Sequence, residues 1–152
     1  MLFKKNKPAI SVSVVELKKD YLFMYENFVF SNQQRLYLIL EKINDEINAL
    51  QFDFLAYKYG YPNDEVGHPF SKYGLGNYGI FKINNSPWLA EIIDNNRQHP
   101  RHSDNIFAQY EHYVVKFKDI TLEVLCRKME EIQITKAYFL ELLEEQMKFV
   151  EL

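Results

Sequence analysis

The segment richest in side chains that could do chemistry is HPRHSD, at positions 99–104. It places two imidazoles, a guanidinium and a carboxylate close together, and His112 follows a few residues later. Neutral imidazole and carboxylate are ligands for zinc or iron, so His99, His102 and either Asp104 or His112 could hold a metal ion. Asp104 could instead orient a histidine for acid–base chemistry. A third interpretation is an anion site formed by the arginine and a helix N-terminus.

A structural interpretation competes with these three. Ser103 or Asp104 has the residue type and position of an N-cap for a short helix over residues 105–110. Arg101 would then hold the loop through backbone carbonyls. Two histidines in a proline-containing loop also lack the fixed geometry that a helix would give them. We therefore favour a structural or surface role and expect neither a metal nor another cofactor. The candidate ligand-binding residues are His68, His99, Arg101, His102, Asp104 and His112.

His68 belongs to a long irregular segment, residues 60–77, that contains four glycines and two prolines. Loops of this length are uncommon in compact domains and are often functional. If the loop folds over a sheet, His68 and nearby tyrosines could form the walls of a pocket for a flat or apolar ligand. The alternative is that the tyrosines seal the edge of the core. These tyrosines are Tyr57, Tyr59, Tyr61 and Tyr73.

Two other features are predicted to carry no chemistry. Gly74, Gly76 and Gly79 superficially resemble a phosphate-binding loop, but that fingerprint follows a strand and opens a helix. Here a strand is expected after the glycines. Cys126 is expected on an inward face, as a small buried hydrophobic residue and not as a nucleophile.

Three helices are predicted from apolar spacing and capping residues. The first, over about residues 32–49, begins with a serine three positions before a glutamine and has apolar residues at steps of three and four. The second begins at Ser86-Pro87, an N-cap followed by proline at the first helical position. The third runs from about Lys136 to Val150 and is capped by Thr135.

The predicted strands include one hairpin whose register can be derived from the sequence. Strands are predicted over residues 8–15, 21–30 and 78–83. The hairpin covers residues 112–126, HYVVKFKDITLEVLC. A two-residue turn at Lys118-Asp119 places six apolar side chains on one face and pairs Lys116 with Thr121 on the other. This register places the six apolar side chains on one face and the charged and hydroxyl side chains on the other.

The region from Ser86 to Cys126 is similar to segments of small, functionally uncharacterised bacterial proteins. The similarity rests on HPRHSD at positions 99–104 and on the His-Tyr hairpin that follows, and it covers about a quarter of the chain. No known activity accompanies this resemblance, so it implies no catalytic role. It does imply that the region is a shared site or a shared structural corner.

Length and composition define the class of protein. The 152 residues fit a single α+β domain, 1–152, and the element order predicts an antiparallel sheet with three main helices packed on one face. The net charge of −3 and the absence of a dominant basic patch argue against nucleic-acid binding. We interpret the short run of Lys4, Lys5 and Lys7 as a solvated tail. The lack of a long apolar stretch argues against a membrane span or signal peptide, and a single cysteine fits the reducing cytoplasm.

Two hypotheses about function follow from these observations. The favoured one is a non-enzymatic intracellular binding protein whose partner is another protein, because no compelling catalytic constellation is visible. An exposed aromatic patch on the folded surface would support it. The alternative is a small enzyme or a metal- or ligand-binding protein. Its site would lie between the 60–77 loop and the His99–His112 segment.

Overall fold

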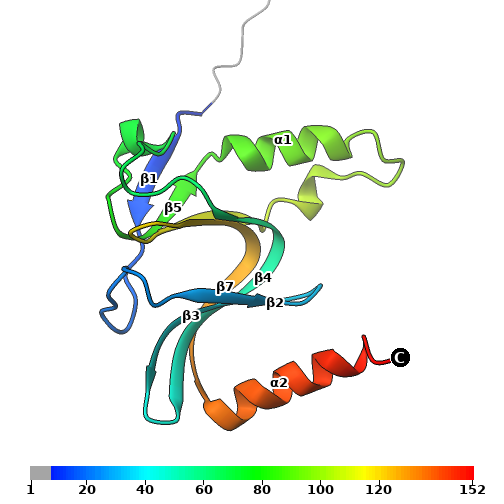
Figure 1. Ribbon diagram of the computed structural model, residues 1–152. Coiled ribbons are helices and arrows are strands. Elements are labelled where there is room, and N and C mark those ends of the chain that lie inside the picture. Colours follow the sequence, from blue (N-terminus) through cyan, green and yellow to red (C-terminus); the bar gives the residue numbers. More distant parts are fainter. Residues whose placement is uncertain (1–7) are drawn as a thin grey trace, which may run out of the picture.

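The computed structural model describes residues 8–152 as one seven-stranded sheet with two α-helices (Figure 1). The N-terminal lysines lie outside the described residues. Every neighbouring pair of strands is antiparallel, in the order β1-β5-β6-β7-β4-β3-β2. The elements are β1 (Ser11–Val14), β2 (Phe28–Ser31), β3 (Leu36–Ile43), β4 (Glu46–Gly60), β5 (Gly79–Asn84), α1 (Pro87–Asn96), β6 (Glu111–Lys116), β7 (Thr121–Thr135) and α2 (Lys136–Lys148), with 3-10 turns at Ser71–Tyr73 and Asp104–Ile106.

The central pair of strands, β4 and β7, joins the two ends of the sheet. Each strand has 15 residues, and their pairing runs from Glu46 opposite Thr135 to Gly60 opposite Thr121. The register shifts between Asp53 and Ala56. Such bulges bend a strand and increase its twist. In Figure 1 the two strands sweep through an arc, with β1 and β5 at one end and β2 and β3 at the other.

Both faces of the sheet are partly covered, so three apolar clusters form. The largest cluster uses one face of β3, β4, β6 and β7, and residues 15–23 pack against it. On the opposite face, a second cluster forms where Phe139 of α2 meets β3 and β4. The third lies where Phe70 and Leu75 of the 62–77 loop cover β5 and β6. The long loop and α1 therefore lie at the β5–β6 end of the sheet, and α2 lies at the opposite end, against β3 and β4 (Figure 1).

The prediction of three main helices packed on one face is wrong, because residues 32–49 form the turn into β3, strand β3 and the start of β4. The side chains of β3 alternate between two apolar clusters. Leu36, Leu38 and Leu40 join the largest one, and Tyr37 and Ile39 join the one beneath α2. A strand buried on both faces has a continuous apolar run, in which steps of three and four also occur.

Several other sequence predictions are confirmed. The β6–β7 hairpin has the expected register, with Tyr113 opposite Val124 and Lys116 opposite Thr121. α1 begins with Ser86 as its N-cap, and α2 begins with Thr135 as its N-cap. Cys126 is fully buried in the largest cluster.

Other predicted elements are shorter in the structure than expected. The strand predicted over 8–15 covers only Ser11–Val14, and that over 21–30 covers only Phe28–Ser31. The helix expected over 105–110 is a 3-10 turn, and Ser103 makes no capping hydrogen bond with its side chain. Within residues 8–152, no helix is long and apolar enough to cross a membrane.

Candidate functional site

The six predicted site residues separate into two groups in the structure. His99, Arg101, His102 and Asp104 form a hydrogen-bonded turn after α1. The Asn96 amide donates to His102 Nδ1 over 2.7 Å, and His102 Nε2 donates to Asp104 over 2.6 Å. The hydrogen bond from His102 and the nearby guanidinium of Arg97 lower the pKa of Asp104.

The rest of this turn is also held by local contacts. His99 Nδ1 accepts the backbone N–H of Arg101 over 3.1 Å, and the His102 ring stacks on Phe107. Among residues 8–152, no cluster of three or more His, Cys, Asp or Glu residues has the geometry to hold a metal ion. The turn therefore has a local partner for each of its imidazoles.

His68 and His112, the second group, meet at the carboxylate of Glu123. His112 Nε2 lies 2.9 Å from Glu123 Oε1, and His68 Nε2 lies 3.4 Å from Glu123 Oε2. His68 Nδ1 accepts the backbone N–H of Phe70 over 3.0 Å, so the proton of its neutral ring lies on Nε2. Among the described residues, that Nε2 makes no aligned hydrogen bond, and the Glu123 carboxylate is the charge that faces it.

Ser86 extends this buried network to the start of α1. Its Oγ lies 2.7 Å from His112 Nδ1 and accepts the backbone N–H of Leu89 over 3.1 Å. A carboxylate can only accept, so the proton of neutral His112 lies on Nε2, and Nδ1 is free to accept the Ser86 hydroxyl proton. The result is a continuous chain of hydrogen bonds from Ser86 through His112 to Glu123.

Glu123 is ionised although its side chain is only 15% exposed. Burial raises the pKa of this carboxyl, but the contacts from His112 and His68 more than offset burial and lower the pKa to about 2. A buried charge is tolerated only when it is paired and hydrogen-bonded. His112 of β6 supplies the hydrogen bond, and His68 of the 62–77 loop places its Nε2 against the other carboxylate oxygen.

Aromatic rings surround the network. The Trp88 and Phe70 rings make T-shaped contacts with the His112 ring, with centroids 5.4 and 5.6 Å away. Lys58 Nζ lies over the Trp88 ring at 4.1 Å from its centroid. These rings exclude water from His112, which strengthens the electrostatic interactions inside the network.

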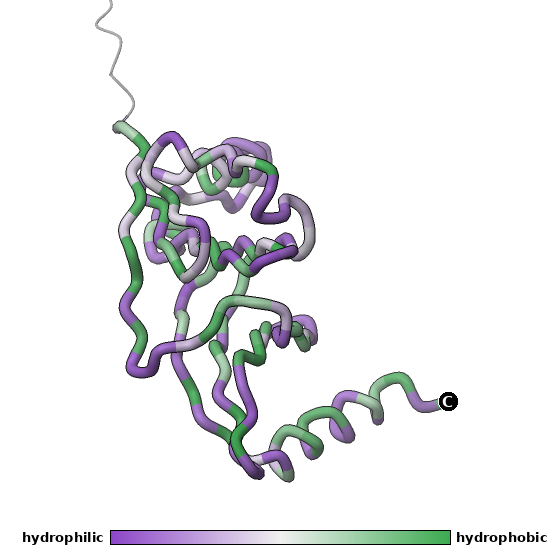
Figure 2. The backbone as a smooth tube through the Cα atoms, turned by 60° about the vertical axis from the view of Figure 1, so that its left-hand side comes forward, coloured by the Kyte–Doolittle hydropathy of each residue, from purple (hydrophilic) through white to green (hydrophobic). Residues whose placement is uncertain are grey.

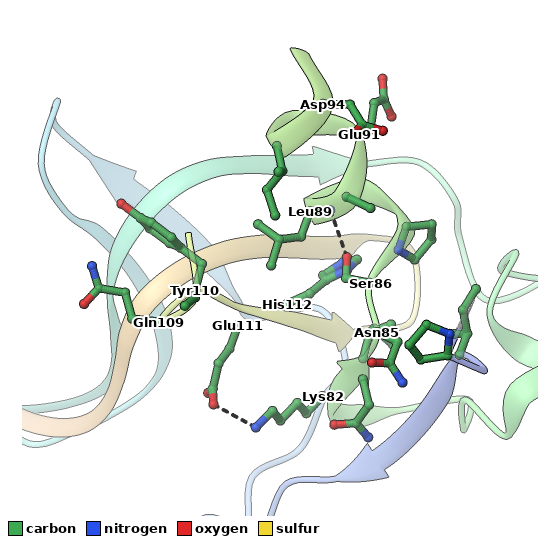
Figure 3. A pocket seen from close by; sticks show the side chains of 18 of the residues that line it. Lys82, Asn85, Ser86, Leu89, Glu91, Asp94, Gln109, Tyr110, Glu111 and His112 are labelled. Atoms are coloured by element: carbon green, nitrogen blue, oxygen red, sulfur yellow. Dashed lines mark hydrogen bonds and ion pairs between the residues drawn. The ribbon is translucent and has the colours of Figure 1, made fainter. Parts of the chain in front are cut away.

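A groove of about 1140 Å³ runs between α1, the β1–β5–β6 end of the sheet and residues 108–111. We call it the α1 groove. Figure 3 shows Ser86 and His112 in the middle of it, between α1 above and β5 below, with the ion pair of Lys82 and Glu111 at one side. Its lining also includes Ile83 and Leu89. The groove thus offers apolar surface beside the buried hydroxyl of Ser86.

A second candidate site lies at the other end of the sheet, on α2. This helix extends away from the sheet (Figure 1), and Phe139 is its only residue classed as buried. Figure 2 shows hydrophobic and hydrophilic residues interspersed along the projecting helix. We call the exposed apolar residues of α2 and of the two positions that follow it the α2 apolar face: Tyr138, Leu140, Met147, Phe149 and Val150.

The fold and these sites define the chain as a single-sheet antiparallel protein with a buried Ser–His–Glu network. Comparison with models of protein families, with curated proteins and with solved structures finds no match. The interpretation of the sites therefore rests on their chemistry.

Ser86 and Glu123 are the site residues that the sequence analysis missed. Ser86 was assigned only as a helix cap, and Glu123 faces the side of the hairpin opposite its six apolar residues. In the β6–β7 register, Glu123 lies opposite Val114, and His112 lies two residues before Val114 on the same strand. That spacing puts His112 and Glu123 on one face of the sheet, which is the signal that could have revealed their contact.

Proposed function

We propose that this protein is an interaction module that binds another protein through the α2 apolar face. The observation that carries this proposal is the exposure of large apolar side chains at the projecting end of α2 and just after it: Met147 is 65% exposed and Phe149 is 83% exposed. Large apolar side chains that are exposed together on one segment are typical of interaction sites. Leu140 and Met147 lie two turns apart on one side of the helix, at the i, i+7 spacing with which a helix binds into a groove.

Charge favours a different protein over a second copy as the partner. Residues 136–152 carry four glutamates and two lysines, and the whole chain has a net charge of −3. At 3.6 residues per turn, Glu144 borders the α2 apolar face on one side and Glu145 borders it on the other. Two copies would bring like charges together, whereas an apolar groove with a basic rim would complement this helix. A cytoplasmic location is part of the proposal and is supported by the single cysteine.

Site-specific photo-crosslinking in the cells that naturally produce the protein tests this proposal. A photoreactive phenylalanine analogue replaces Met147, and the matched control carries it at Glu141, on the polar side of the same helix. We expect one discrete adduct with a different protein from position 147 and none from position 141. With that partner purified, Met147→Lys should weaken binding at least about tenfold in a calorimetric titration.

Three results would overturn the proposal. The first is equal crosslinking from both positions, and the second is the absence of any adduct from position 147. The third is an adduct between two copies of this chain, which would show that the α2 apolar face mediates self-association and does not bind a different protein. Circular dichroism of each variant confirms that the fold is retained, so a loss of binding reports on the α2 apolar face.

A further inference from the structure

The Ser86 hydroxyl has more partners than a helix cap requires. An N-cap serine needs only to accept one backbone N–H, and Leu89 supplies it. The Ser86 hydroxyl also contacts the fully buried imidazole of His112, and His112 in turn contacts the largely buried, ionised carboxylate of Glu123. Burying the charge of Glu123 costs free energy, and the role of Ser86 as an N-cap does not require that charge. The arrangement instead directs the hydroxyl proton of Ser86 toward a base.

We propose that Ser86 is a nucleophile, activated by His112 and Glu123, that hydrolyses small carboxylic esters bound in the α1 groove. The roles of a catalytic triad are recognised by geometry and not by sequence position. Ser86 Oγ and His112 Nδ1 are 2.7 Å apart, within the range of a nucleophile and its base. Glu123 fixes the tautomer of His112 through Nε2 at 2.9 Å and stabilises the imidazolium.

The position of Ser86 at the start of α1 also favours the ionised hydroxyl. The N–H of Leu89 points at Oγ, and the N-terminal end of a helix carries partial positive charge. Both stabilise negative charge that develops on Oγ as its proton moves to His112. Ser86 and His112 are catalytic residues under this proposal, and Glu123 is a positioning residue.

The reaction proceeds in two balanced steps. Ser86 Oγ attacks the ester carbonyl carbon, its proton passes to His112 Nδ1, and the bond to the alcohol oxygen breaks as that oxygen takes the proton. Water then attacks the acyl group on Ser86, its proton returns through His112, and the carboxylic acid leaves with Ser86 restored. Ile83 and Leu89 line the groove beside Ser86, so a short apolar acyl chain suits the site.

The test uses the purified full-length protein with two probes, a fluorophosphonate and p-nitrophenyl butyrate. We expect fluorophosphonate to modify Ser86, as located by mass spectrometry of peptides, and p-nitrophenol to be released in a burst. Ser86→Asn keeps a capping side chain but lacks the hydroxyl, and it should lower the hydrolysis rate at least about 100-fold. Ser103→Ala, at an exposed serine outside the groove, should leave the rate unchanged.

The positioning role of Glu123 is tested by a pH profile. Glu123→Gln should lower the rate of fluorophosphonate labelling and change its dependence on pH, while His112→Gln should abolish labelling. Circular dichroism and thermal unfolding establish that each variant is folded. If folded wild-type protein shows no Ser86 adduct, the proposal fails. Labelling of Ser86 at the same rate in His112→Gln would also overturn it, because the hydroxyl would then react without its base.

Discussion

Glu123 stabilises the contact between three segments that are distant in the sequence. It lies on β7, while its partners His112 and His68 come from β6 and from the 62–77 loop. Ser86 then connects the same network to α1. The carboxylate therefore holds a strand, a loop and a helix together. Removal of its charge would leave two buried imidazoles facing each other without an anion.

The ionisation of Glu123 makes its contribution to stability dependent on pH. Its pKa is lowered from 4.5 in the unfolded chain to about 2 in the fold, so the contribution is fully present above pH 4.5 and is lost as the pH falls through 2. This shift corresponds to about 3 kcal/mol. We expect Glu123→Gln to lower the free energy of unfolding at pH 6 and to differ less from wild type at pH 3. Urea denaturation at both pH values measures this, and a difference that does not change with pH would contradict it.

The sequence identified the histidines of this network but not its other members. His68 and His112 stand out because imidazole is rare and chemically versatile. Ser86 and Glu123 belong to common residue types with ordinary local roles, a helix cap and a polar position in a hairpin. Their contact depends on where the loop and α1 fold over the sheet, and short-range spacing carries no information about that. Nothing in the spacing of these residues predicts that the HPRHSD turn and His112 lie in two different groups.

At the level of secondary structure, local patterns were reliable wherever one face of an element is polar. α2 has such a face. The β6–β7 hairpin has polar residues, among them Lys116 and Thr121, on the face opposite its six apolar residues, although that face is largely buried, and both elements were predicted. β3 is apolar on both faces, so apolar residues also recur at steps of three and four, and this spacing was interpreted as that of a helix. The turn before it added to the error, because Asn32 Oδ1 accepts the N–H groups of Gln34 and Arg35. Hydrogen bonds of this kind occur at helix starts and in turns alike.

The β3–β4 turn offers a test of the hairpin that replaces the predicted helix. Asn44 has a φ of 54°, in the left-handed region that favours glycine or asparagine. We expect Asn44→Gly to preserve or slightly raise the free energy of unfolding. Asn44→Val should lower it by about 1–2 kcal/mol, because a β-branched residue is strained in that conformation. Guanidinium denaturation of the matched pair measures both values, and the opposite order of stability would exclude this turn.

The whole molecule has a central sheet with two ends that are stabilised separately. The α2 end contacts the sheet mainly through Phe139, Leu142 and Leu143, whereas the later residues of α2 are largely exposed. We expect removal of residues 145–152 to change the unfolding midpoint by only a few degrees. Phe139→Ala, in contrast, should cost about 3 kcal/mol because it leaves a cavity. Thermal unfolding followed by circular dichroism compares the two, and a large loss on truncation would mean that the end of α2 supports the fold.

The long pairing of β4 with β7 also constrains the order in which the protein can fold. β4 ends at Gly60, but its partner does not begin until Thr121, near the end of the chain. Contacts between distant segments form slowly, because a large loop must close before they are made. During synthesis, β3 and β4 leave the ribosome as a hairpin with one edge unpaired, and that edge is an aggregation risk until β7 covers it. The free edge of β4 therefore stays open to aggregation until β7 has been synthesised and pairs with it.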